Sequence, residues 1–339
     1  MIITLQKRKI YIFVGLSHVM AFISCKTING KKRFYLEKSV RLPDGKAKKF
    51  SIYLKDYSPK KKYKEISHCK KLLGAKISEE LIEFAARNYK KFNVYDEGLI
   101  KKLEEIKIGY KKIIRRINKK QMQDIIDRFT ANFTYESNAI EGNSLTLKDV
   151  TFILHEKKTL RGKDLREIYE TLNTREAMEL VFKNKLKIKE KDIIKLHKVL
   201  VKNTGISYGY KKLPNFLLAR QVETTPPEKV KQGMKKLIDW YYKNKEIHPL
   251  QRAAMFHGKF EKIHPFEDGN GRVGRLIINI MLLNHRYPPL IIRKSQKISY
   301  FNCLEAFDNG HEDKLNRFLI EKYKKTYEKF FKVYINYLK

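Results

Sequence analysis

The chain has 339 residues, of which 74 are lysine or arginine and 37 are aspartate or glutamate, giving a formal net charge of +37. Its length allows one large domain or two smaller ones, and an apolar content of 42% is ordinary for a globular protein. The excess charge is mostly lysine spread over every segment, which argues against nucleic acid as a partner. The three isolated cysteines form neither a disulfide framework nor a zinc site, so we expect a cytoplasmic protein.

The N-terminal residues allow several interpretations. Residues 10–25 follow Lys7-Arg8-Lys9 and superficially resemble a signal peptide, but they lack a small-x-small cleavage site. Their alternation and β-branched content suit a strand equally well, and a translation start at Met20 is a third interpretation. Because no apolar run reaches about 18 residues, we expect no transmembrane helix and no membrane partner.

Residues 1–60 predict a small β segment. The segments 32–42 and 46–54 flank Pro43-Asp44-Gly45, which is typical of two strands around a turn, and Asn29-Gly30 marks another turn. A two-stranded ribbon is marginally stable alone, so we expect it to pack on the helical body or to bind a partner.

Helical periodicity then continues to the end of the chain. Residues 58–76 are interpreted as a lysine-rich linker, and Ser78 as the N-cap of the first helix. Further helices are predicted at about 97–117, 119–141, 147–156, 163–183, 190–202, 228–243, 250–263, 270–284, 296–308 and 313–335. The fold class is therefore mostly α with a small N-terminal β segment.

Polar chemistry is concentrated between two of these helices, in His264-Pro-Phe-Glu-Asp-Gly-Asn-Gly-Arg-Val-Gly-Arg275. The glycines and the start of the next helix offer backbone N–H groups to an anion. Arg272 and Arg275 lie on one helix face and suit phosphate oxygens, and Asp268 suits Mg²⁺. His264 suits a general base, so the segment predicts a nucleotide phosphate site beside a base.

This stretch resembles the Fic family signature, HPFx[DE]GNGRxxR, at every defined position. Fic proteins are all-α enzymes, and most transfer AMP from ATP to a hydroxyl side chain of a protein. The resemblance implies that His264 deprotonates the target hydroxyl and that Asp268 holds Mg²⁺. It implies a nucleotide and phosphate site made of Asp268, Gly269, Asn270, Gly271, Arg272, Val273, Gly274 and Arg275. The Doc-like kinases of the superfamily carry lysine in place of Gly271, so this glycine favours AMP transfer over phosphorylation.

A second motif lies upstream, where Ser137 and Glu141 share a helix face and Gly142 suits a helix end. It resembles the family's inhibitory motif, [ST]xxxE[GN], on a helix at about 119–142. The resemblance implies that Glu141 pairs with Arg275 and misplaces ATP. In some relatives the same glutamate positions a water that removes AMP, so deAMPylation is an alternative function.

Two further regions are assigned by resemblance alone. Residues 215–225 fall where the family has a short flap hairpin that clamps the target segment, and the candidates are Ala219, Arg220, Gln221 and Val222. Tyr300 and Asp308 fall on the adenine side of the family's site, although relatives often carry asparagine where this chain has Asp308.

The resemblance also implies an organisation and a set of partners. We expect a helical region at 61–160, a Fic catalytic domain at 185–325 and a C-terminal helix end at 326–339. ATP is the expected co-substrate, a protein with a Ser, Thr or Tyr hydroxyl is the expected target, and a homodimer is allowed because family members often dimerise. The alternatives are a basic nucleic-acid-associated regulator with a vestigial Fic fold, and an enzyme that transfers UMP or phosphocholine.

Overall fold

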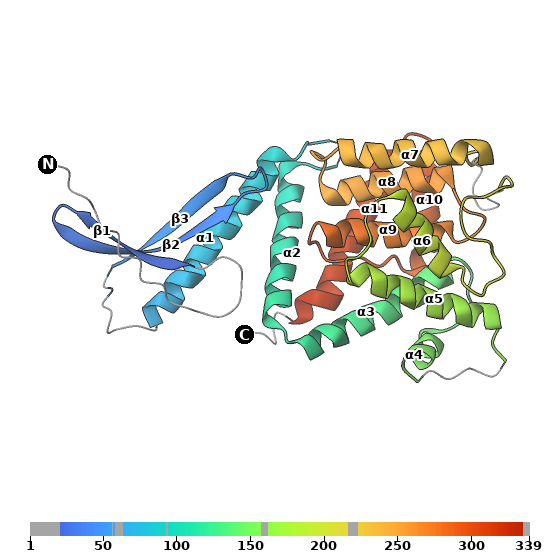
Figure 1. Cartoon of the computed structure of the whole chain (residues 1–339), viewed down its shortest axis with the longest axis horizontal. Coiled ribbons are helices and arrows are strands. Elements are labelled where there is room, and N and C mark those ends of the chain that lie inside the picture. Colours follow the sequence, from blue (N-terminus) through green and yellow to red (C-terminus); the bar gives the residue numbers. More distant parts are fainter. Residues whose placement is uncertain are drawn as a thin grey trace. The chain divides into compact units, whose positions relative to one another are not determined.

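The computed structural model describes residues 21–55, 57, 64–92, 94–156, 162–215 and 223–334. The chain divides into two compact units, Met1–Arg87 and Asn88–Lys339 (Figure 1). Each unit has its own hydrophobic core and is described by itself.

The first unit contains an antiparallel sheet with the strand order β1-β2-β3. Its strands are β1 (Phe22–Ile28), β2 (Lys31–Arg41) and β3 (Ala47–Leu54). Asn29 and Gly30 connect the first pair with φ of 51° and 73°, the left-handed conformations that a tight hairpin requires. The predicted β segment is confirmed, and β1 adds a third strand to the expected pair.

The helix α1 (Lys64–Asn88) packs on one side of this sheet. The predicted linker is therefore wrong over residues 64–76, and Ser78 lies inside the helix, where its hydroxyl donates to the Gly74 carbonyl oxygen at 2.8 Å. The many lysines of this segment made its apolar residues, which have helical spacing, difficult to recognise in the sequence. These apolar residues and the strand residues that they contact are Ile66, Cys69 and Leu73, packed with Ile23, Leu36, Phe50 and Leu54.

The second unit is helical. Its elements are α2 (Glu97–Arg116), α3 (Lys119–Ile140), α4 (Leu147–Glu156), α5 (Leu165–Phe182), α6 (Glu190–Leu200), α7 (Pro227–Lys243), α8 (Pro249–Ile263), α9 (Asn270–Asn284), a 3₁₀ turn (Lys294–Gln296), α10 (Lys297–Asp308), α11 (Glu312–Thr326) and a π-helical segment (Tyr327–Lys332). The helices predicted from residue 97 onward are all present, with ends within two residues of the prediction except at the C-terminal end of the last. The mostly α fold class is confirmed.

Side-chain caps explain why several boundaries are readable. The Asp96 carboxylate accepts from the Leu99 N–H at 2.7 Å at the start of α2. Asn118 and Gln121 form a reciprocal capping box at the start of α3. Each cap satisfies N–H groups that a helix start leaves without an intrahelical acceptor, so α2 and α3 begin where the sequence predicts.

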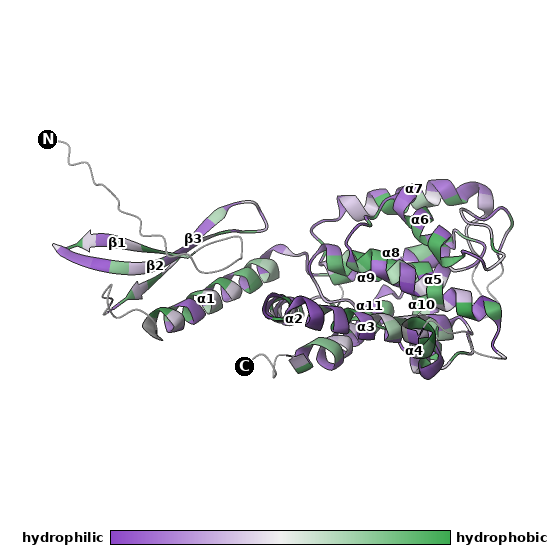
Figure 2. Ribbon diagram, turned by 60° about the horizontal axis from the view of Figure 1, so that its bottom comes forward, coloured by the Kyte–Doolittle hydropathy of each residue, from purple (hydrophilic) through white to green (hydrophobic). Residues whose placement is uncertain are grey.

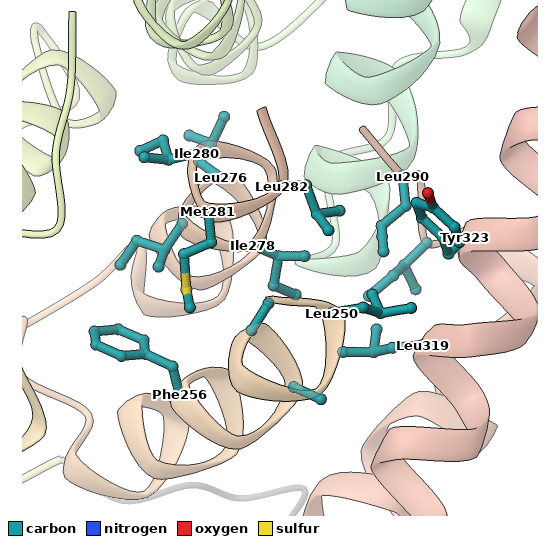
Figure 3. Close-up of a cluster of buried hydrophobic side chains, with 14 of the residues drawn as sticks. Leu250, Phe256, Leu276, Ile278, Ile280, Met281, Leu282, Leu290, Leu319 and Tyr323 are labelled. Atoms are coloured by element: carbon teal, nitrogen blue, oxygen red, sulfur yellow. The ribbon is translucent and has the colours of Figure 1, made fainter. Parts of the chain in front are cut away.

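The helices α8 and α9 form the centre of this core. Leu250 and Phe256 of α8 face Ile278 and Met281 of α9, and all four side chains are buried (Figure 3). Both helices carry long hydrophobic stretches in the hydropathy colouring (Figure 2). Because α8 and α9 are buried along their length, the loop that joins them has fixed ends.

Within the part of the chain that the structure describes, no helix is both long and apolar enough to cross a membrane.

Gly258 tests the close packing of α8. A Cβ at this position would lie 2.6 Å from the Phe307 ring, so Gly258→Ala should lower the free energy of unfolding by about 1–3 kcal/mol. Urea denaturation measures the change. Gly233→Ala in α7 is the control, because its Cβ would meet Ile263 at an ordinary 3.7 Å and should not destabilise. Equal destabilisation of both variants would contradict the close packing.

Candidate functional site

The loop between α8 and α9 is held by side-chain amides. Asn270 closes it, because its Oδ1 accepts from the Phe266 N–H at 2.9 Å and its Nδ2 donates to the Phe266 carbonyl at 2.8 Å. Asn215 donates to the Phe266 and Glu267 carbonyl oxygens, each at 3.0 Å. These bonds satisfy the backbone of a loop that lies between two buried helices. The loop therefore presents its side chains in one defined arrangement.

His264 ends α8 in a left-handed conformation, with φ of 49° and ψ of 62°. Such a conformation is uncommon for a residue with a side chain, and it turns the chain into the loop directly after the helix. The imidazole Nδ1 lies 3.3 Å from the Glu261 carbonyl oxygen, which can only accept, so Nδ1 carries the proton in this pairing. The lone pair of the neutral ring is then on Nε2, as a general base requires.

The backbone at the start of α9 suits an anion. Gly269 is the N-cap with φ of 80°, and the first N–H groups of the helix have no intrahelical acceptor. Gly271 lies in the first turn, where a Cβ would come within 2.2 Å of Glu141 Oε1 and 2.9 Å of Arg275 Nη1. A side chain at Gly271 would therefore displace the acid and the arginine that meet beside it.

Arg275 is buried and contacts the C-terminal end of α3. Its Nη2 donates to Glu141 Oε1 at 2.6 Å and to the Ser137 carbonyl oxygen at 2.8 Å, and its Nε donates to the Ser137 hydroxyl at 3.0 Å. Burial alone would lower the pKa of Arg275, but the Glu141 carboxylate raises it overall. The guanidinium is thus fixed in its charged form, 134 residues away in sequence from its carboxylate partner.

Asp268 lies at the more exposed side of the loop and is also paired. Its Oδ2 is 2.7 Å from Arg166 Nη2 and 3.3 Å from Arg272 Nη2. Glu170 completes the group, because its Oε1 is 3.3 Å from Arg272 Nη1 and 3.4 Å from Arg166 Nε. Arg166 and Glu170 of α5 are residues that the sequence analysis missed, since neither belongs to a local motif.

His197 of α6 is another residue that the sequence did not indicate. Its Nε2 lies 3.0 Å from the Asp268 carbonyl oxygen, and its Nδ1 accepts from the Gly209 N–H at 3.1 Å. The ring stacks on Phe266 with centroids 3.9 Å apart. Burial lowers the pKa of His197 to about 4, so the ring is neutral and holds the loop through one tautomer. No short sequence pattern links position 197 to the loop.

Three further residues of the predicted site, Val273, Gly274 and Tyr300, lie in the buried surroundings of Arg275 and the loop. Val273 is buried in the core, and Gly274 leaves room for Glu261, whose Oε1 would lie 2.5 Å from a Cβ there. Tyr300 is also buried, with its hydroxyl 2.6 Å from His257 Nε2 and the Arg275 guanidinium 6.0 Å from its ring centroid.

Two predicted residues lie at helix ends outside the loop. Gly142, with φ of 107°, follows the end of α3 in the turn after Glu141, and Asp308 is the last residue of α10. The flap candidates Ala219, Arg220, Gln221 and Val222 lie outside the described residues.

Among the residues that the structure describes, no group of three or more His, Cys, Asp or Glu side chains is arranged to hold a metal ion. Asp268 is therefore a single carboxylate beside the anion site. Such a residue fits a Mg²⁺ ion that takes its other ligands from water and bound phosphates, as is usual for this ion.

Comparison with known proteins finds relatives of this chain. Residues 187–282 match the family model described as the Fic/DOC family. The chain is 36% identical over 183 residues to "Protein adenylyltransferase Fic" of Nematostella vectensis, which covers 52% of this chain and 43% of the relative. It is 32% identical over 197 residues to the Drosophila willistoni protein of the same name, and this alignment covers 57% of this chain and 40% of the relative. The chain thus matches less than half the length of each of these relatives.

Solved structures show the same fold. A Fic domain containing signaling protein from Bacteroides thetaiotaomicron aligns with a TM-score of 0.61 and 25% identity, over 67% of this chain and 94% of that chain. Fic-1 from C. elegans aligns with a TM-score of 0.58 and 24% identity, over 67% of this chain and 69% of that chain.

The neutral state of His197 predicts a pH dependence of stability. The unfolded chain protonates this imidazole near its ordinary pKa of about 6.5, whereas the folded chain does so near 4. The free energy of unfolding should therefore decrease as the pH falls through this range, and the His197 contribution at pH 5 should be about 2 kcal/mol below that at pH 7.

Urea denaturation of the wild type and of His197→Gln at both pH values measures this contribution. The variant should be less stable at pH 7 and should lose less stability between pH 7 and pH 5. The same substitution at the exposed His311 should keep the wild-type pH dependence. An unchanged pH dependence in His197→Gln would contradict the assignment.

Proposed function

We propose that this chain, which contains a Fic/DOC-family domain at residues 187–282, is a protein adenylyltransferase that transfers AMP from ATP to a Ser, Thr or Tyr hydroxyl of a target protein. The observation that carries the proposal is the placement of His264 shortly before the first N–H groups of α9, inside the region that matches the Fic/DOC family model. Only four residues separate the base His264 from the anion site at residues 269–271, so a hydroxyl bound at the base and a phosphate bound at the N–H groups would meet.

Two buried arginines support a polyphosphate substrate. Arg275 Nη1 and Arg272 Nε are buried N–H groups with no hydrogen-bond acceptor among the described residues. Buried donors without acceptors are costly, and phosphate oxygens would satisfy them. Together with the amides of α9, these groups offer donors to the α-, β- and γ-phosphates of one nucleotide.

The proposed reaction is an in-line displacement at the α-phosphorus. His264 Nε2 accepts the proton of the target hydroxyl while the hydroxyl oxygen forms a bond to phosphorus. The bond from the α-phosphorus to the bridging oxygen of the β-phosphate breaks, and diphosphate leaves with the negative charge. Residues 269–271 stabilise the charge on the α-phosphate through their N–H groups, once the Gly269 N–H leaves Asp268 Oδ1, to which it donates in this structure.

Asp268 would hold Mg²⁺ that arrives with the nucleotide. Bound there, the ion would neutralise charge on the phosphates. The carboxylate is 37% exposed, with Arg166 and Arg272 at its Oδ2 and the Gly269 N–H donating to its Oδ1. A bound metal ion would compete with these partners for the carboxylate oxygens.

Glu141 opposes the productive pose of ATP. Its carboxylate takes the Arg275 Nη2 donor at 2.6 Å and lies beside Gly271, close to where the phosphates would bind. A carboxylate near phosphates repels them, and the Arg275 Nη2 group that donates to it is not available to the γ-phosphate. The chain is thus self-inhibited in this arrangement.

His264→Ala tests the base. The purified wild type with ATP and Mg²⁺ should incorporate AMP from α-labelled ATP into protein, and the variant should lose at least about 10²-fold of the rate. The exposed His311→Ala is the matched control and should label at the wild-type rate. Labelling by His264→Ala at the wild-type rate would exclude His264 as the base, and label from γ-labelled ATP in its place would exclude AMP transfer.

Glu141→Gly and Glu141→Gln test the inhibition. A charge-assisted hydrogen bond is worth about 1.5–3 kcal/mol, so releasing Arg275 should raise the labelling rate about tenfold to a hundredfold at limiting ATP. Isothermal titration should show tighter ATP binding by the same variants. The exposed Glu105→Gln in α2 removes an equal charge and should change neither quantity. Rates in both Glu141 variants no higher than in the wild type would contradict self-inhibition.

A further inference from the structure

The three strands of the first unit collect charge. Between Phe22 and Leu54 the sequence has nine lysine or arginine residues and two acidic ones, Glu37 and Asp44. One face of the sheet is covered by α1, through the core that includes Leu36, Phe50 and Leu54. The opposite face, called the open face below, consists of the alternate residues of each strand.

The register of the strands shows what the open face carries. Five of its residues are basic and one is acidic. The basic residues are Lys26, Lys31, Arg33, Arg41 and Lys49, and the acidic residue is Glu37. Glu37 is buried beneath two ammonium groups, with Lys26 Nζ at 3.1 Å and Lys49 Nζ at 2.5 Å from its carboxylate oxygens. The surface that remains exposed on this face is positive.

Aromatic rings lie between these charges. Tyr35 of β2 is the direct cross-strand partner of Tyr53 of β3, and their ring centroids are 5.4 Å apart. The Lys26 ammonium lies 4.6 Å from the Tyr35 centroid, and the Arg33 guanidinium carbon lies 6.0 Å from the Tyr53 centroid. Tyr53 is 45% exposed. The open face thus combines exposed aromatic surface with cations held beside it.

We propose that the open face of the β1-β2-β3 sheet binds single-stranded nucleic acid. Tyrosine rings offer planar surfaces on which unpaired bases stack, and flanking lysine and arginine residues neutralise the phosphates on either side. An acidic peptide or an anionic lipid surface would account for the cations, but neither needs adjacent rings at the middle of the sheet. This binding is separate from the adenylyltransferase function, whose residues all lie in the second unit.

The full-length chain is titrated into a fluorescein-labelled oligothymidine of about 12 nucleotides, with fluorescence anisotropy as the readout. Tyr35→Leu and Tyr53→Leu should each weaken binding at least about fivefold and leave the salt dependence unchanged, because they remove stacking and no charge. Tyr53→Leu alters an exposed position of an edge strand, so it keeps the test valid if Tyr35→Leu unfolds the sheet.

The double variant Lys31→Gln/Arg33→Gln removes two charges of the open face and leaves the Glu37 ion pairs in place. It should weaken binding and lower the slope of log K against log salt by about 1.4, at about 0.7 per phosphate contact of a single strand. The matched control, Lys70→Gln/Lys71→Gln on exposed positions of α1, should bind like the wild type after correction for net charge.

Three results would overturn the proposal. The first is a loss of affinity in the α1 control as large as in the open-face variant. The second is tyrosine variants that bind the oligonucleotide as tightly as the wild type. The third is that polyglutamate, or vesicles of anionic lipid, compete with the labelled oligonucleotide as effectively as unlabelled oligothymidine does, and that Tyr53→Leu weakens their binding to the same extent.

Discussion

The charge of one buried arginine constrains the architecture around the candidate site. Arg275 is 2% exposed, and a guanidinium removed from water needs oxygen acceptors on several sides. Ser137 and Glu141 supply them at the C-terminal end of α3, so this contact ties α3 to α9. Under the proposed function, catalysis and inhibition compete for this cation, and replacing Glu141 by phosphate would exchange one anionic partner for another without leaving Arg275 unpaired.

The helix α5 contacts both α3 and α9 close to the Arg275–Glu141 ion pair. Its Thr174 donates to Asn138 of α3 at 2.9 Å, and Glu170 accepts from Asn143, just beyond Glu141, at 3.0 Å. The same Glu170 pairs with Arg272 at the start of α9, so one carboxylate connects the residues after Glu141 to the first turn of α9. A shift of the end of α3 would therefore be felt at Arg272 as well as at Arg275. Under the proposed self-inhibition, this connection would extend the effect of the end of α3 from Arg275 to Arg272.

The sequence predicted what is local and missed what is made by the fold. Helix boundaries such as those of α2 and α3 were readable because side-chain caps lie next to them in sequence. The His264–Arg275 stretch was readable for the same reason. The contacts of His197 and Asn215 with the loop were missed, because these residues lie 71 and 51 positions upstream of their partners and only tertiary packing brings them there. The first half of α1 was missed because lysines dilute its apolar stripe, and the neighbouring sheet decides its conformation.

The charge distribution of the N-terminal unit was also not predictable from the sequence alone. Along the chain its lysines are evenly spread, which favours a uniformly solvated surface. Strand alternation places five of the eight basic strand residues on the open face and three on the opposite face, because residues two apart share a face. Strand pairing then brings Lys26 beside Arg33 and Tyr35 beside Tyr53. A patch built this way has no linear motif. Net charge alone therefore neither supports nor excludes a nucleic-acid surface. The strand register, by contrast, shows which basic and aromatic residues lie together on one face of the sheet.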